Sequence, residues 1–184
     1  MDDDSSAPDW IQAVREHRAA KSRAFESADS PLSESAQQSF DGLDFFPIDE
    51  NYRVTGRFEP LSDPESVSLD ATRGPPVSFE HVGQLGVEIA GELQVLAVYR
   101  APGVDALLVP FRDDTNGTET WAKGRYLNLT APAASGRVSV PVDFNLAYLP
   151  LCVYDETVSS AIPPMENEIS TAVRAGEKGR PTGE

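Results

Sequence analysis

The chain has 184 residues, 40% hydrophobic and 8% aromatic, so it is long and apolar enough to fold as one domain with its own core. Its 30 acidic residues against 15 basic ones give a net charge of −15, which repels nucleic-acid phosphates and anionic lipid and excludes both as expected partners. Only three of the 15 basic residues are lysines. An acidic surface poor in lysine predicts a protein adapted to molar salt.

The first predicted elements are helical. Residues 1–8 are acidic and small, and we expect them to be disordered. Apolar residues at helical spacing follow a capping aspartate and predict an amphipathic helix over residues 9–26. Ser30 and Pro31 are a favourable pair for an N-cap and a first helical position, so they predict a short second helix ending near Gln38.

From residue 40 the pattern changes to about eight short alternating segments with turn residues between them. Residues 51–60 and 66–71 are expected as separate strands, a tight turn is expected at Ala90-Gly91-Glu92, and residues 167–177 are expected as the last strand. Short links favour antiparallel neighbours over a βαβ arrangement. The predicted fold class is therefore mainly β, an antiparallel barrel or sandwich.

These elements fill residues 9–178, which we expect to form a single domain, with residues 179–184 as a disordered tail. The N-terminus lacks the apolar run of a signal peptide, and no stretch approaches ~18 apolar residues. The sequence therefore predicts a cytoplasmic protein. It leaves the oligomeric state open.

The stretch FRDDTNGTETWAKGRYLNL, residues 111–129, is dense in polar residues. Asn116-Gly117 is favoured at the centre of a tight hairpin turn, since both residue types tolerate positive φ. Asp113 is placed to accept hydrogen bonds from amides two or three residues further on. With Gly117 as the invariant glycine of a calcium loop, the first and last ligand positions fall on basic residues. The stretch predicts a turn, and no metal site is expected.

Arg125, near the end of this stretch, alternates in phase with Leu127 and is expected to face inward. A buried guanidinium needs a negative partner, because an unpaired buried charge is too costly. Two alternatives remain open. Arg125 either forms a structural ion pair with Asp143 or Glu177, or presents its fork to the carboxylate or phosphate of a ligand.

Three blocks of the chain carry longer motifs. They are HRAAKSRAFESADSPLSESAQQSFDGLDFFPIDENYRV, PFRDDTNGTETWAKGRYL and VDFNLAYLPLCVYDETVSSAIPPMENEISTAVRAGEK. Together they span most of residues 17–178 and resemble the DUF1684 family of bacterial and archaeal proteins of unknown function. The resemblance implies domain boundaries and a shortlist of polar residues, and it implies no reaction.

Cys152 is the single cysteine, so no internal disulfide can form. Its apolar neighbours, Leu151 and Val153, predict a buried and inert thiol. In the family that the chain resembles, a second cysteine is common where Ser160 stands here. A disulfide or metal site that needs both cysteines is therefore not expected in this chain.

The polar residues of the matched blocks suggest a ligand pocket. The candidate binding residues are Arg125, Asp143, Asn145, Tyr148, Asn167 and Glu177. Brought together at one end of a barrel, these groups would orient a small polar or anionic molecule by hydrogen bonds. The alternative is structural: Asp143 and Asn145 cap an irregular crossing after a strand, and Arg125 pairs with an acid.

Two other functions are open. A hydrolase-like enzyme would use Asp143 or Glu177 as a general base, with Arg125 holding an anion. A structural or interaction module would dock a partner without any ligand. No cofactor is expected, because the sequence contains no glycine-rich phosphate loop, dinucleotide-binding motif or zinc-ligand spacing.

Overall fold

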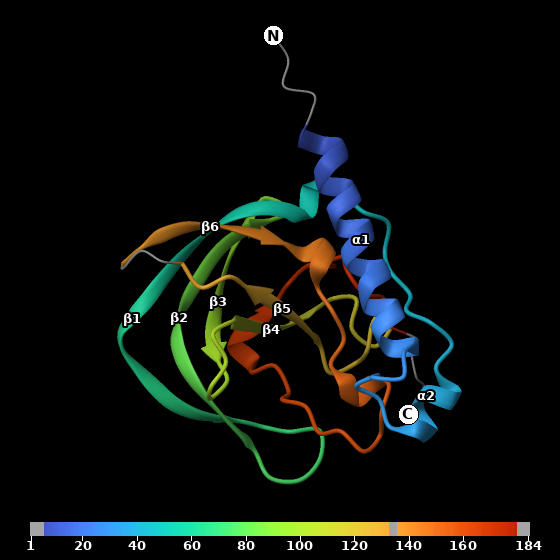
Figure 1. The fold of residues 1–184 in the computed structure, drawn as a ribbon. Helices are drawn as coiled ribbons and strands as arrows, with labels where there is room; N and C mark the ends of the chain where they lie inside the picture. Colours follow the sequence, from blue (N-terminus) through green and yellow to red (C-terminus); the bar gives the residue numbers. More distant parts are fainter. Residues whose placement is uncertain (1–5, 133–135, 180–184) are drawn as a thin grey trace.

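A curled β-sheet forms the body of the molecule, and a long helix lies along one side of it (Figure 1). The structure is a computed structural model that describes residues 6–132 and 136–179. Of the two ends predicted to be disordered, residues 1–5 and 180–184 lie outside the described part of the chain.

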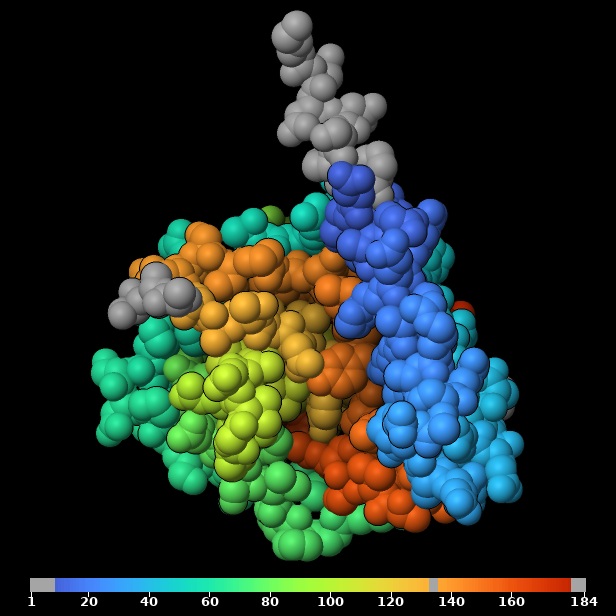
Figure 2. Space-filling view, viewed as in Figure 1, coloured from blue at the N-terminus to red at the C-terminus, as the bar shows by residue number. Residues whose placement is uncertain are grey.

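The long helix, α1 (Ser6–Glu26), contains the predicted helix and begins three residues earlier, so residues 6–8 are helical. Its inner face buries Val14 and Phe25, which are 2% and 4% exposed. Its exposed side chains include Arg15, Glu16 and Arg23 as well as several alanines, and in Figure 2 the helix stands out as a ridge along the body. Burial of one apolar stripe is the main source of stability for such a surface helix.

The short helix, α2 (Glu34–Ser39), begins later than predicted. Its N-cap is Ser33, whose hydroxyl accepts from the amide of Ala36 at 3.4 Å, and not Ser30. The carboxylate of Asp155 explains the difference, because it accepts the backbone N–H of Ser33 at 2.6 Å and so fixes the chain at that residue.

Seven strands make up the sheet, which is mainly antiparallel as predicted. They are β1 (Arg53–Leu69), β2 (Val77–Ile89), β3 (Glu92–Arg100), β4 (Leu107–Asp113), β5 (Arg125–Leu129), β6 (Val138–Asp143) and β7 (Glu168–Ile169). The order is β5-β4-β3-β2-β1-β6, with β7 added in parallel to β4. The two ends of this order, β5 and β6, are not paired within the described residues, so the sheet is a curled half-barrel with seven strands rather than eight.

One long strand, β1, replaces the two strands expected over residues 51–60 and 66–71. It pairs with β2 on both sides of an irregularity, where residues 61–64 stand opposite the single residue Val82. The turn between β2 and β3 is confirmed, and Ala90 and Gly91 both have positive φ, 53° and 82°. Such a turn matches the twist of the two strands that it joins.

The expected last strand over residues 167–177 is wrong except for β7. Beyond Ile169 the chain is irregular, because several of its carbonyl groups are bound by the side chain of Arg125 instead of a neighbouring strand. The inside of the half-barrel is a continuous apolar core. Its most buried members include Leu85, Val98, Val109, Phe111, Val142, Phe144, Ile169 and Val173.

Asn167 joins β3 to β4 where the two strands cannot bond directly. Pro110 on β4 has no amide hydrogen, so it cannot donate to β3. The Asn167 side chain fills this position: its Oδ1 accepts from the amide of Ala97 at 2.7 Å, and its Nδ2 donates to the carbonyls of Ala97 at 2.9 Å and Pro110 at 2.7 Å. Asn167 is fully buried, so nothing else is placed to satisfy these groups.

We predict that Asn167→Ala lowers the free energy of unfolding by about 3 kcal/mol, since it leaves buried backbone groups without partners. Urea unfolding at fixed salt measures the change. Asn51→Ala, at an exposed asparagine, is the matched control and should cost less than about 1 kcal/mol. Equal losses in the two variants would contradict the role assigned to Asn167.

Candidate functional site

Arg125 opens β5, and its guanidinium is fully buried, as its position in the sequence predicts. Its Nη2 atom donates to Oδ2 of Asp113 at 2.8 Å and to the carbonyl of Val173 at 2.7 Å. Its Nη1 atom donates to the carbonyls of Ala175 at 2.5 Å and Glu177 at 3.1 Å. The guanidinium therefore faces one carboxylate and three backbone acceptors.

The acid that neutralises Arg125 is Asp113. The predicted ion pair of Arg125 with the carboxylate of Asp143 or Glu177 is therefore wrong. Strand register explains this choice. Phe111 stands opposite Arg125, and Asp113 lies two residues further along β4 on the same face. The rings of Phe111 and Phe46 cover the guanidinium, with centroids 5.2 and 5.8 Å from its central carbon.

The loop that joins β4 to β5 is wider than the two-residue turn predicted at Asn116-Gly117. Gly117 has the expected positive φ of 80°, and Asp113 accepts from the amide of Thr115 at 2.9 Å, as predicted. The loop widens because its side chains bond to one another: Thr115 and Thr120 share a 2.8 Å hydrogen bond, and Nδ2 of Asn116 donates to Thr120 at 2.9 Å.

Asp143 and Asn145 hold the crossing after β6, as the structural alternative expected. Asp143 caps the short 3-10 helix η2 (Phe144–Leu146) by accepting from the amide of Asn145 at 2.9 Å. Its other oxygen accepts from the indole nitrogen of Trp10 at 2.7 Å and so anchors α1. The side chain of Asn145 exchanges two hydrogen bonds with the backbone of Asp49.

Glu177 is another buried acid, and it is fully inaccessible to solvent. Its Oε1 atom accepts a very short hydrogen bond from the ammonium of Lys21 on α1. Its Oε2 atom accepts from the amide of Leu149 at 2.7 Å and from the hydroxyl of Tyr154 at 3.1 Å. Burial raises the pKa of Tyr154, and the negative charge of Glu177 raises it further.

Tyr148 lies beside this ion pair, with its ring centroid 4.9 Å from Nζ of Lys21. Its hydroxyl donates to Oδ1 of Asn128 at 2.9 Å. Burial raises the pKa of Tyr148 to about 12, although the hydrogen bond to Asn128 acts in the opposite direction. The phenol is therefore a neutral donor near neutral pH.

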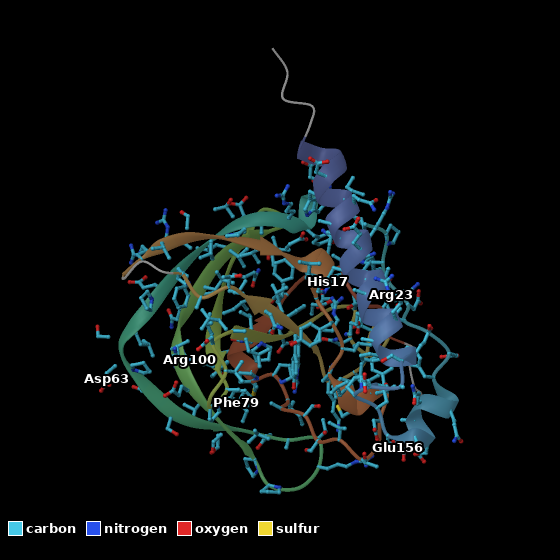
Figure 3. All side chains as sticks on the ribbon, in the orientation of Figure 1. His17, Arg23, Asp63, Phe79, Arg100 and Glu156 are labelled. Carbon is cyan, nitrogen blue, oxygen red and sulfur yellow. The ribbon has the colours of Figure 1, made fainter. Side chains whose placement is uncertain are left out.

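Three of the six candidate residues share a cavity, and it is small. Asn145, Tyr148 and Glu177 line it together with His17 of α1, which is labelled in Figure 3. Its volume is about 10 Å³, which holds one water molecule at most. Arg125, Asp143 and Asn167 do not line it, so the six residues do not surround one ligand-sized space.

A larger space lies on the other side of Glu177. This α2 hollow has a volume of about 460 Å³. It is bounded by the end of α2, residues 40–44, part of residues 149–154, and residues 178–179. Among its lining residues are Phe40, Leu43, Asp44, Leu149, Tyr154 and Lys178.

The sequence-based shortlist missed the α2 hollow, because none of its six polar residues lines the hollow and many of the lining residues are apolar. A signal was present in the first matched block, where Phe40-Asp41-Gly42-Leu43 forms a compact motif. Gly42 has a φ of 104°, a conformation that other residues rarely adopt. It turns the chain where it passes from α2 along the hollow.

Cys152 lies in the 3-10 helix η3 (Leu151–Val153) and is half-buried, not buried as predicted. This short helix runs at the surface and contains no fully buried residue. No group of three or more histidine, cysteine, aspartate or glutamate side chains within residues 6–132 and 136–179 is arranged to hold a metal ion.

A family model described as "Protein of unknown function (DUF1684)" matches residues 38–178. The chain belongs to the DUF1684 family. The match confirms the resemblance seen in the sequence. The matched region does not include α1, although one of the three blocks begins inside that helix.

The solution NMR structure of an uncharacterized protein from Haloarcula marismortui is similar to this DUF1684 chain, with a TM-score of 0.74 and 36% identity. The likeness covers 95% of this chain and 97% of the other. The comparison with curated proteins gives no match. No helix of the described residues is long and apolar enough to cross a membrane.

We predict that Arg125→Lys lowers the free energy of unfolding by about 3 kcal/mol, because one ammonium cannot reach a carboxylate and three carbonyls at once. Arg137→Lys is the matched control, since Arg137 pairs with Glu59 at the surface and is 56% exposed. Its effect should stay within about 0.5 kcal/mol in the same urea titration. A similar loss of stability in both variants would contradict the role of Arg125 in holding these segments together.

Acid should weaken the N-terminal attachment of α2, whose end borders the α2 hollow. This attachment is made by Asp155, which accepts from the amide of the N-cap residue Ser33. Hydrogen bonds from Thr157 and from the amide of Ser33 hold the pKa of Asp155 below its ordinary value of 3.8. A lowered pKa stabilises the fold above the unfolded value and ceases to do so as pH falls through the folded value. We expect the melting temperature of the native protein to fall more steeply than that of Asp155→Asn below about pH 4. Parallel curves would contradict this.

Proposed function

We propose that this DUF1684 protein binds an apolar amino acid, or a zwitterion of similar build, in the α2 hollow. The observation that carries the proposal is a cationic group close to acidic groups in a partly apolar space. Lys178, Asp44 and Asp41 line the hollow, and its sides include Phe40 and Leu43. A carboxylate would pair with Lys178, an ammonium with Asp44, and an apolar side chain with the walls.

The size of the hollow supports this assignment. Its volume of about 460 Å³ lies within the range of ~300–1,000 Å³ usual for small-molecule sites. Its wall is also well fixed. The rings of Phe40 and Tyr154 meet edge to face with centroids 6.0 Å apart, and the amide of Lys178 donates to the carbonyl of Asp44 at 2.9 Å.

Glu177 acts as a positioning residue for this site. Its carboxylate bonds directly to Leu149 and Tyr154, and it immediately precedes Lys178. One buried acid thus places three of the lining residues. The predicted importance of Glu177 is retained in this proposal, while the ligand moves from the side of Arg125 to the adjacent hollow.

The hydrolase-like alternative draws less support. A general base must reach the substrate, and Glu177 is fully buried with both oxygens bonded to protein donors. Both oxygens of Asp143 are also engaged, by Trp10 and Asn145. An interaction module needs no ligand-sized cavity, whereas the α2 hollow is of ligand size.

Binding is tested by following amide signals in ¹H–¹⁵N spectra while L-phenylalanine or L-leucine is added. We expect saturable shifts at Gly42 and Gly179, which line the hollow. Phenylpropionate and phenethylamine, which lack the ammonium and the carboxylate respectively, should each bind more weakly.

Lys178→Ala should raise the Kd for L-phenylalanine about tenfold, the loss of one charge-assisted hydrogen bond, and should leave phenethylamine binding unchanged. Lys123→Ala removes another lysine, one that is exposed and does not line the hollow, and is the matched control. The proposal fails if neither amino acid gives saturable shifts at these glycines, or if the two lysine variants behave alike.

A further inference from the structure

A second hollow lies beneath the irregularity in β1, far along the chain from the α2 hollow. Between Pro60 and Glu65 the strand departs from β2, so that residues 61–64 face only Val82. The prolines at positions 60 and 64 have no amide hydrogen and cannot restore the ladder. The departure leaves a hollow of about 450 Å³, which we call the bulge hollow.

The floor of the bulge hollow is part of the core. Phe58, Val82 and Leu107 line it, and all three belong to the buried cluster inside the half-barrel. Leu61 and Pro132 are among the residues at its sides. Contact between this apolar surface and water is unfavourable. An aliphatic chain bound against the surface would remove it from water.

Arg100 is the one charged residue among the described residues that line the bulge hollow. It is the last residue of β3. Its Nε atom donates to Glu80 at 3.1 Å, and the two side chains are 38% and 49% exposed. Neither terminal nitrogen donates to a described residue, so the fork of two Nη atoms remains for an acceptor.

We propose that the bulge hollow binds an aliphatic carboxylate. The chain lies on Phe58, Val82 and Leu107, and the carboxylate accepts from both Nη atoms of Arg100 while Nε stays on Glu80. A monoanion suits this site better than a phosphate ester, because the carboxylate of Glu80 beside Arg100 repels a second negative charge. This site goes beyond the proposed function and does not depend on it.

Decanoate at concentrations below micelle formation is the probe, and ¹H–¹⁵N spectra are the readout. We expect saturable shifts at Leu107 and Gly136, which line the bulge hollow, and none at Gly42 and Gly179, which line the α2 hollow. Shifts at the second pair alone would overturn this site while leaving the α2 hollow as a binding site. Shifts spread over the whole surface without saturation would overturn it as well.

Arg100→Gln should raise the Kd for decanoate about tenfold and leave the Kd for decanol unchanged, since decanol has the chain without the charge. Arg137→Gln is the matched control, because Arg137 also pairs with a surface glutamate and does not line either hollow. Equal effects of the two arginine variants, or decanol binding as tight as decanoate, would contradict the proposal.

Discussion

One buried guanidinium organises this molecule. An isolated charge in an apolar core is too costly to persist, so the guanidinium of Arg125 needs an opposite charge and acceptors for its two terminal nitrogens. Asp113 supplies the opposite charge, and the carbonyls of Val173, Ala175 and Glu177 supply the rest. Those three carbonyls belong to a segment that forms almost no strand of its own. Arg125 therefore substitutes for a neighbouring strand and determines the path of the chain from residue 173 to residue 177.

This path places Glu177 between the sheet and α1, where Glu177 in turn fixes the segments on either side of it. On one side it pairs with Lys21 and so attaches α1 to the body. On the other it holds Leu149 and Tyr154 in the wall of the α2 hollow. Asp113 and Glu177, two of the buried acids, thus have separate structural tasks: Asp113 neutralises Arg125, and Glu177 connects helix, sheet and hollow. The proposed ligand site depends on this arrangement, although none of its direct contacts is made by Arg125.

Much of the fold was predictable from the sequence, because alternation, turn residues and a helical stripe are local signals. The inward direction of Arg125 and the capping role of Asp143 also followed from local spacing. The partner of Arg125 did not, because it depends on the register that sets Phe111 opposite Arg125. The last strand failed for a related reason: the carbonyl groups of Val173 and Ala175 are bound by the side chain of Arg125, which lies far away in the sequence. Both hollows arise where distant segments diverge or meet, which no local pattern reports. The adaptation of the acidic surface to molar salt and a cytoplasmic location stay predictions.

The most direct test of this account is amide hydrogen exchange in Arg125→Lys compared with the native protein. The amides of Glu177 and Lys178 donate to the carbonyls of Ala147 and Asp44 in the described structure. The account predicts that both amides lose protection in the variant by a larger factor than those of Leu85 and Leu96 in the centre of the sheet. Uniform loss across the sheet and the segment, or unchanged protection at Glu177, would contradict the claim that Arg125 sets the course of this segment.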